Sequence, residues 1–188
     1  MERDRHPSLE KPIFFDPVSV QAVLTGLKTQ TRRAFSLSES RPDVLTESAL
    51  KGWRPQYKRG DILWVREAWG IGIEAAGGII YKADYIDKKA PLAEGQHWRP
   101  SMRMPRSVAR LFLRVTDVRL ERLQDISEGD AIEEGLDNAA DYTPEQNIAR
   151  FAAFWDSFSV KRGYGWDTNP WVWAYTFERI KGVPKSGK

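Results

Sequence analysis

Near the end of the chain runs the segment Trp171-Val172-Trp173-Ala174-Tyr175-Thr176-Phe177. Its alternation predicts a β-strand with aromatic side chains on one face and small or β-branched side chains on the other. Because both faces are nearly apolar, we expect this strand to be central or to be wrapped by a helix. The segment 144–158 is the candidate helix, since Thr143 is a good N-cap and apolar residues follow at helical spacing.

The beginning of the chain predicts a second helix that leads into a basic segment. Asp16-Pro17 reads as an N-cap followed by the first helical position, and Gly26 stands where a left-handed cap would end the helix. The apolar positions between them follow the helical period: Val20, Val23, Leu24 and Leu27. We therefore expect residues 28–33 to form a loop that leaves a helix C-terminus.

Short apolar or alternating segments predict the remaining strands, at 13–15, 62–67, 79–81 and 109–115. The alternation changes phase near Asp117, which indicates a β-bulge. Ser127 opens a short helix that Gly135 closes, and residues 70–78 form a loose hairpin. The pattern favours an α+β, mainly β, fold, in which short helices flank a closed or partly closed antiparallel barrel.

Composition narrows the class of protein. The chain has 188 residues and no cysteine, which suits one domain without disulfides or thiolate metal sites. We expect that domain to span 11–180, with flexible tails at 1–10 and 181–188 and a surface excursion at 35–57. No apolar segment has the length of a signal peptide or of a membrane span, so we expect a cytoplasmic protein without a membrane partner.

The charge pattern permits an anionic partner and gives no sign of a metal site. The net charge is +3, a mild basic excess that does not by itself demand nucleic acid. His6 and His97 are too few and too distant to bind a metal ion, and there is no glycine-rich phosphate loop. We expect no cofactor.

The segment from Lys28 to Arg33 is the sharpest candidate site. It places three cations and two threonine hydroxyls within six residues. Arg32 and Arg33 disfavour a protonated Lys28, and a lysine with a lowered pKa can take a proton from a nearby hydroxyl such as that of Thr31. The alternative interpretation is a solvated polar loop.

A carboxylate partner for the lysine is expected from the acidic helix, whose candidates are Glu128, Asp130, Glu133 and Glu134. Glu134 falls in the last turn, just before Gly135, where a negative charge opposes the helix dipole at a cost of roughly 0.3–1 kcal/mol. This small cost favours a functional role only slightly. The alternative is an exposed helix carboxylate.

Charged and aromatic residues also mix at two other places. Arg66 and Glu67 lie between Trp64 and Trp69, and they form either a mutual salt bridge or a pocket wall that reads a base edge, with Trp69 as a stacking face. The tract 98–106, which contains Arg103, either lines a groove for phosphate or covers the barrel.

Taken in order, these segments resemble the ASCH superfamily. The stretch from Val23 to Arg32 is similar to its signature loop, Gly-x-Lys-x-x-Thr-x-Arg, and Gly60-Asp61 to its following strand. The helix before Gly135 is similar to its acidic helix. The tract 98–106 and the ending Asn169-Pro170-Trp171-Val172-Trp173 resemble a longer branch that is common in phage and prophage genomes.

The resemblance implies a PUA-like barrel with a cleft beside the lysine. Small bacterial members hydrolyse N(4)-acetylcytidine to cytidine and acetate, and their lysine, threonine and glutamate match Lys28, Thr31 and Glu134. In that scheme the lysine activates the threonine, which attacks the amide carbonyl. Another member is a ribonuclease on single-stranded RNA that also depends on a cleft lysine.

Three hypotheses follow. The first is an amidohydrolase of N(4)-acylated cytidine, with Lys28, Thr31 and Glu134 as catalytic residues. The second is a ribonuclease and the third a non-catalytic RNA-binding protein. The expected partner is a nucleoside or single-stranded RNA, bound by a larger set of residues: Arg33, Arg66, Glu67, Trp69 and Arg103.

Overall fold

The computed structural model of the chain describes residues 10–35, 54–73, 78–136 and 142–182. Their main feature is a mixed five-stranded sheet in the order β1-β3-β6-β7-β2. Its strands are β1 (Glu10–Phe14), β3 (Ile62–Arg66), β6 (Phe112–Arg122), β7 (Trp171–Ile180) and β2 (Gln30–Ala34). β1 and β3 pair in parallel, and the other three pairs are antiparallel.

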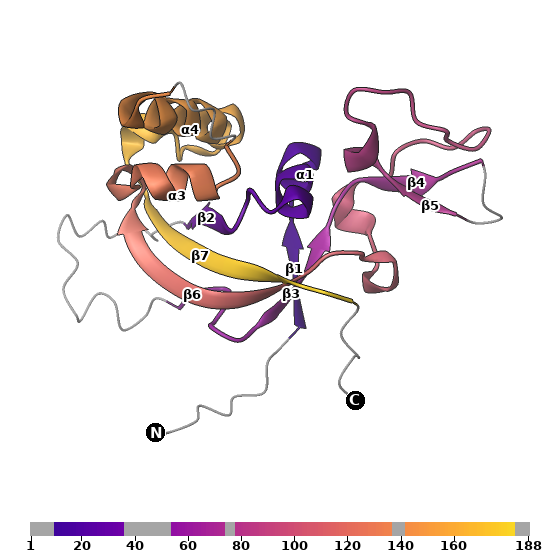
Figure 1. Cartoon of the computed structure of the whole chain (residues 1–188), viewed down its shortest axis with the longest axis horizontal. Helices are drawn as coiled ribbons and strands as arrows, with labels where there is room; N and C mark the ends of the chain where they lie inside the picture. The colour runs from indigo at the N-terminus through magenta and orange to yellow at the C-terminus, as the bar shows by residue number, and fades with distance from the viewer. Residues whose placement is uncertain (1–9, 36–53, 74–77, 137–141, 183–188) are drawn as a thin grey trace.

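The predicted α+β, mainly β, fold class is confirmed. β6 and β7 are long and strongly curved, but the described strands form an open sheet whose edges are β1 and β2 (Figure 1). The parallel β1–β3 pair is a difference from the all-antiparallel prediction. It arises because α1 (Pro17–Thr25) and the excursion separate the two strands along the chain, so no hairpin joins them.

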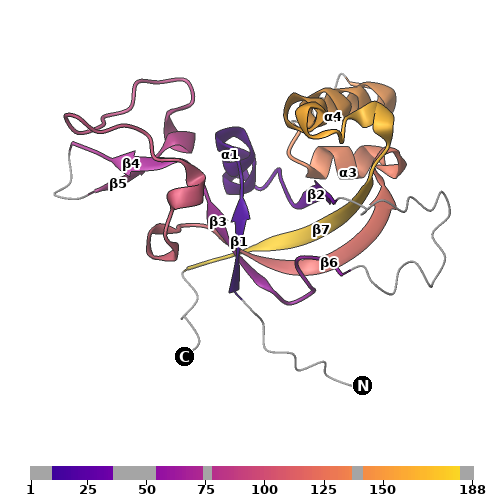
Figure 2. The ribbon, with the colours of Figure 1, turned by 180° about the vertical axis from the view of Figure 1, so that it is seen from behind.

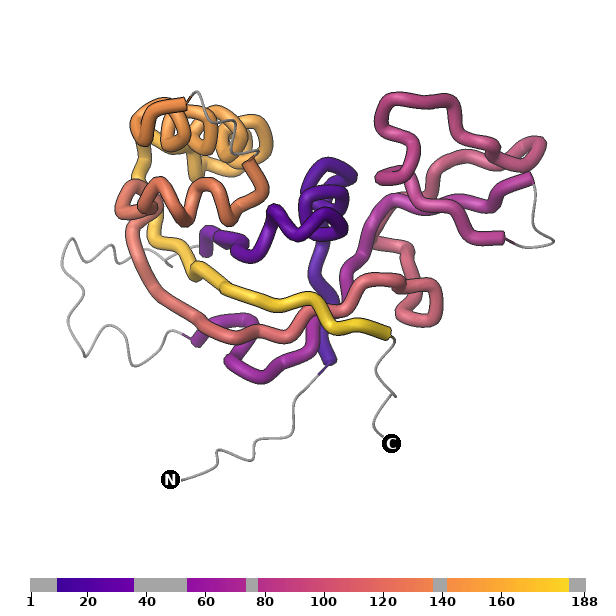
Figure 3. Tube along the Cα trace, in the orientation of Figure 1, coloured from indigo at the N-terminus to yellow at the C-terminus, as the bar shows by residue number. Residues whose placement is uncertain are grey.

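The helices lie over the concave side of the curved strands. α3 (Glu128–Glu133) and α4 (Pro144–Ser159) cover one end, α1 lies over the middle, and β4 (Trp69–Ile71) and β5 (Ile79–Tyr81) form a small separate sheet at the other end (Figures 1 and 2). The tube in Figure 3 shows the same order along the chain, with α1 between the two flanking units.

The aromatic strand β7 is central, as its sequence predicts. It lies between β6 and β2. Tyr175 and Phe177 belong to the main core, whereas Val172 packs with Phe151 and Trp155 of α4 on the other face. The strand is therefore both internal and wrapped by the predicted helix. The predicted bulge is confirmed, because the β6–β7 register shifts between Val115 and Asp117.

Local capping explains where the helices begin and end. The Asp16 side chain accepts hydrogen bonds from the first turn of α1, and Gly26 ends the helix with φ 84°. α3 and α4 both begin with a capping box, whose N-cap residues are Ser127 and Thr143. These helix boundaries are confirmed.

The predicted loop at 28–33 is wrong in part. Gln30–Ala34 forms strand β2, which pairs with β7 so that Thr31 lies opposite Tyr175. A polar strand of this kind is stable because the carboxylates of α3 and β6 satisfy its inward-facing side chains. The predicted strand at 109–115 likewise begins later, at Phe112, after the 3-10 turn Arg106–Val108.

Several predictions concern residues outside the described part of the chain. These are both tails at 1–9 and 183–188, residues 36–53 of the excursion and the tip of the hairpin at 74–77. Within the described ranges, no helix is long and apolar enough to cross a membrane.

Candidate active site

The structure brings Lys28 and Glu134 into direct contact. The Lys28 amine donates to Glu134 Oε2 at 2.7 Å and to the Glu134 backbone carbonyl, also at 2.7 Å. Both residues are buried, with exposed fractions of 3% and 6%. The two backbones form a bridge at this point, and the Thr29 amide donates to the Glu133 carbonyl at 2.8 Å, so the end of α3 is fixed against the start of β2.

Gly135 allows this close approach of α3 to the lysine. Its φ is 100°, which is a left-handed conformation, and a Cβ at this position would lie 2.8 Å from Ala22 Cβ and 3.1 Å from Lys28 Cβ. A glycine therefore meets two requirements here: the sharp turn after α3 and the contact with the last turn of α1.

Burial lowers the pKa of Lys28 from its ordinary value. The charge of Glu134 and its hydrogen bond offset this in part, whereas the nearby Arg33 lowers the pKa further. A neutral lysine amine has two N–H donors and one lone pair. Because two acceptors of Glu134 already receive hydrogen bonds from the amine, the neutral form would keep its lone pair free to accept a proton.

Thr31 is the buried second residue of β2, two positions before Arg33. Its side chain is 3% exposed and, opposite Tyr175, faces the same side of the sheet as Arg33. Among the described residues, no hydrogen bond joins the Thr31 hydroxyl to the Lys28 amine. A proton transfer between them therefore requires a small rearrangement or a bridging group.

Arg33 shares an aromatic neighbour with the lysine. Its guanidinium lies 5.5 Å from the centre of the Phe15 ring, and the Lys28 amine lies 5.6 Å from the same centre. Arg33 donates to the Phe14 carbonyl at 2.8 Å and is only half-buried. Burial lowers its pKa. Two cations at one ring make this side of the sheet attractive to an anionic or carbonyl oxygen.

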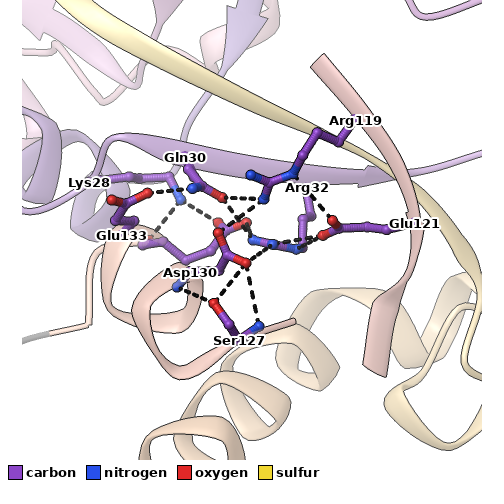
Figure 4. A network of polar contacts seen from close by, with 9 residues as sticks. Lys28, Gln30, Arg32, Arg119, Glu121, Ser127, Asp130 and Glu133 are labelled. Carbon is purple, nitrogen blue, oxygen red and sulfur yellow. Dashed lines mark hydrogen bonds and ion pairs between the residues drawn. The ribbon is translucent and has the colours of Figure 1, made fainter. Parts of the chain in front are cut away.

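A polar network that the sequence did not reveal includes Lys28 and extends across β2, β6 and α3 (Figure 4). Arg32 is at its centre, because β2 alternation sends Arg32 and Arg33 to opposite faces. Its other members come from β2, β6 and α3: Gln30, Arg119, Glu121, Ser127, Asp130 and Glu133. The sequence signal for this network is the alternation of side chains along residues 30–34, which sends Gln30 and Arg32 to one face. It was not recognised because the segment was predicted to be a loop.

The carboxylates of this network are held by strong donors. Burial alone would raise the pKa of Asp130, but hydrogen bonds from Gln30, Arg119 and Ser127 and the charge of Arg32 lower it to about 2. Glu133 accepts a hydrogen bond from the Gln30 side chain. Asp130 therefore stays ionised over the whole physiological range.

Arg66 and Glu67 do not pair with each other, so the expected mutual salt bridge is wrong. Arg66 donates to the Met104 carbonyl at 3.0 Å and stacks on aromatic rings. Glu67 is 1% exposed and binds Arg110 through both oxygens, at 2.8 and 2.9 Å. Burial raises the pKa of Glu67, and Arg110 offsets part of that effect. Arg66 is the last residue of β3 and Glu67 the first residue after it, and each finds its partner in a different later segment.

The other predicted binding residues lie in the unit around β4 and β5, on the far side of α1 from α3 (Figures 1 and 2). Trp69 is 6% exposed, packs in a core with Met104 and Phe112, and carries Arg99 at 4.7 Å over its ring. Arg103 is exposed, in the 3-10 turn Ser101–Arg103. The structure thus brings Lys28, Arg33 and Glu134 together, shows no hydrogen bond among the described residues from the Thr31 hydroxyl to any of them, and leaves Trp69, Glu67 and Arg103 elsewhere.

Among solved structures, those similar to this chain include an ASCH domain and protein EF3133. No protein family model matches this chain, and no curated protein sequence matches it. An ASCH domain from Lactobacillus crispatus JV V101 is 12% identical, with a TM-score of 0.46 over 95% of this chain and 86% of that chain. Protein EF3133 from Enterococcus faecalis V583, described as family-model DUF984, is 16% identical, with a TM-score of 0.44 over 94% of this chain and 78% of that chain. Values this low identify neither a family nor a substrate.

Proposed function

We propose that this chain is a single ASCH-like domain spanning 11–180 and that it hydrolyses the amide of N(4)-acylated cytidine. The observation that supports this proposal is the buried contact between the Lys28 amine and Glu134, at 2.7 Å. Burial lowers the pKa of this amine, which favours a role as a general base. A purely structural lysine would more commonly lie at the surface.

The proposed reaction begins when the Lys28 lone pair takes the proton of the Thr31 hydroxyl. The Thr31 oxygen attacks the acyl carbonyl carbon, and the bond from that carbon to N4 of the base then breaks. N4 takes the proton from the Lys28 ammonium, and cytidine leaves. Water, deprotonated by the same amine, then attacks the acyl carbon, the bond from that carbon to the Thr31 oxygen breaks, and this oxygen regains its proton from the Lys28 ammonium. The net products are cytidine and a carboxylic acid, and the protein returns to its starting state.

Arg33 and Glu134 have supporting roles in this scheme. The half-buried Arg33, on the same side as Thr31, is the candidate donor to the oxyanion that forms on the acyl oxygen. Glu134 orients the amine through its two acceptors and stabilises the ammonium that forms during the reaction. The same arrangement would suit other small acylated amines, so the acyl-cytidine substrate is the part of the proposal that most needs a test.

The test is incubation of the purified protein with N(4)-acetylcytidine, with chromatographic measurement of cytidine. Lys28→Met and Thr31→Ala should each reduce kcat by about 100-fold or more, because each removes a reacting group. Thr31→Ser should retain much of the activity. Lys161→Met, which changes an exposed lysine in a distant turn, is the matched control and should behave as the wild type. Full activity of Thr31→Ala would exclude Thr31 as the nucleophile.

A second candidate, single-stranded RNA binding with or without cleavage, is favoured by the cations near β4. The Arg99 guanidinium lies 4.7 Å from the centre of the Trp69 ring, and the exposed Arg103 follows in the next turn. Cations beside aromatic rings are common on surfaces that bind single strands. The test is binding of a labelled oligoribonucleotide: affinity should fall steeply with salt, and Arg99→Ala with Arg103→Ala should weaken it. Cleavage without added metal that is lost in Lys28→Met would indicate a ribonuclease.

A further inference from the structure

The carboxylate of Glu134 is shared between two basic side chains, Lys28 just before β2 and Arg32 within it. Its Oε2 accepts from the Lys28 amine at 2.7 Å, and its Oε1 accepts from Arg32 Nη1 at 3.2 Å. All three side chains are almost completely buried, with exposed fractions of 2%, 4% and 0% for Lys28, Glu134 and Arg32. Arg32 is therefore the side chain that holds the oxygen of Glu134 that the lysine does not bind.

Arg32 is itself fixed in direction. Its Nε donates to Glu121 Oε1 at 2.9 Å, and its Nη2 lies 2.7 Å from the same oxygen and 3.3 Å from Asp130 Oδ2. The Nη2 contacts are ion pairs without directed hydrogen-bond geometry. The ring of Phe151 lies 6.0 Å from the guanidinium carbon. Because a guanidinium is planar and rigid, fixing Nε and Nη2 also fixes where Nη1 points.

The two acids that fix Arg32 are themselves anchored from outside. Arg119 donates to Asp130 Oδ1 at 3.0 Å and lies 3.4 Å from Glu121 Oε2. The hydroxyl of Ser127, the N-cap of α3, donates to Asp130 Oδ2 at 2.9 Å. Glu121 and Asp130, called the clamp below, thus connect β6 to the helix that ends at Glu134, as the dashed lines in Figure 4 show for these residues.

The negative charges of the clamp mean that Arg32 acts on Glu134 mainly through the direction of its hydrogen bond and only weakly through its positive charge. Glu121 and Asp130 already offset the charge of Arg32, so Arg32 adds little net positive potential at Glu134. What it supplies is a donor at a fixed place. We infer that Arg32 is a positioning residue that holds Glu134 Oε1 so that Oε2 faces the Lys28 amine, and that Glu121 and Asp130 form the clamp that aims it.

This inference rests on the proposed function for its catalytic consequence, but its test does not require substrate. In lysine-labelled protein, NMR titration gives the pKa of Lys28, whose signal is identified by its absence in Lys28→Met. The charged groups that face this amine are Glu134, Arg33 and, more distantly, Asp16. Of these, Glu134 raises the pKa of the lysine most strongly.

The decisive variant is Arg32→Lys, which keeps the charge but loses the planar fork. If Arg32 positions Glu134, the pKa of Lys28 falls below the wild-type value, toward that of Glu134→Gln, and combining the two changes lowers it no further. Arg114→Lys is the matched control. It alters an exposed Arg–Glu pair, Arg114 with Glu178, between β6 and β7, and should leave the pKa of Lys28 unchanged.

Activity gives a second readout. With N(4)-acetylcytidine, Arg32→Lys should reduce kcat about 10- to 100-fold with little change in KM, because a displaced group costs reactivity rather than binding. If no variant and no wild-type protein hydrolyses the substrate, the proposed function fails while the titration still decides the role of Arg32.

The outcomes are separable even if Arg32→Lys does not fold. Glu121→Ala removes the acceptor of Arg32 Nε from a partly exposed position and should lower the pKa of Lys28 in the same direction, by less. A wild-type pKa of Lys28 in whichever of these variants folds would overturn the inference. So would strictly additive effects of Arg32→Lys and Glu134→Gln, since independent effects mean that Arg32 does not act through Glu134.

Discussion

Removing the Lys28 side-chain charge should destabilise the protein more than removing the charge of Glu134. In Lys28→Met, the Glu134 carboxylate stays buried with only the 3.2 Å contact to Arg32. Breaking a buried pair from one side costs about 3–5 kcal/mol, and the remaining contact places this variant near the lower value, about 3 kcal/mol. In Glu134→Gln an amide oxygen still accepts from the lysine, which can lose its proton, so the cost should be about 1–2 kcal/mol.

The double variant gives the coupling between the two residues. Lys28→Met with Glu134→Gln leaves no charge of the pair unpaired, so its loss should be smaller than the sum of the single losses by about 2 kcal/mol. Urea unfolding, followed by tryptophan fluorescence and far-ultraviolet circular dichroism, measures each free energy. The same cycle on the exposed Arg114–Glu178 pair is the control and should give a coupling below about 1 kcal/mol. Additive losses for Lys28 and Glu134 would refute a buried ion pair in solution.

The pH dependence of stability follows from the same lysine. Burial lowers the pKa of Lys28 in the folded protein below its ordinary value of 10.5. The unfolded chain therefore binds more protons at this position, and the free energy of unfolding contributed by Lys28 rises as pH increases toward 10.5. Lys28→Met should lack this rise, which urea unfolding at a series of alkaline pH values would measure.

Three further predictions concern the surroundings of the site. Gly135→Ala should destabilise by about 1–2 kcal/mol more than Gly60→Ala in urea unfolding, since both have positive φ but only Gly135 meets close neighbours; equal losses would mean that the contact with α1 relaxes freely. Arg110→Met should cost about 3–5 kcal/mol at neutral pH and clearly less near pH 4.5, because burial raises the pKa of Glu67 and acid then neutralises the abandoned carboxylate; a loss independent of pH would contradict this. The pKa of Tyr175 is raised to about 12, so Tyr175→Phe should remove a spectroscopic tyrosine titration near pH 12 and no earlier one.

The sequence was sufficient for elements whose patterns are local. Asp16-Pro17 and Gly26 set the ends of α1, and the phase change at Asp117 placed the bulge of β6 correctly. The two apolar faces of β7 predicted its internal position. Each of these depends on capping or alternation within a few residues, and such signals can be read along one strand or helix.

The site was only partly predictable, because its central contacts join segments that are distant in sequence. Lys28 and Glu134 were proposed as partners from a family resemblance, whereas the clamp around Arg32 had no local signal. A run of polar residues after a helix ordinarily predicts a loop. Here the donors of β2 are satisfied by acids from β6 and α3, which a single sequence does not align with them. The partner of Glu67 was missed for the same reason, since Arg110 is also remote in sequence.

The bridge between the start of β2 and the end of α3 also bears on how copies of this protein behave in a crowded solution. β2 is an edge strand, and an unprotected edge offers its backbone to other chains. The Lys28–Glu134 bridge and the Thr29–Glu133 hydrogen bond engage the backbone just before β2 with backbone from the same molecule. Lys28 and Glu134 thus also shorten the stretch of exposed backbone at this edge with which another chain could pair.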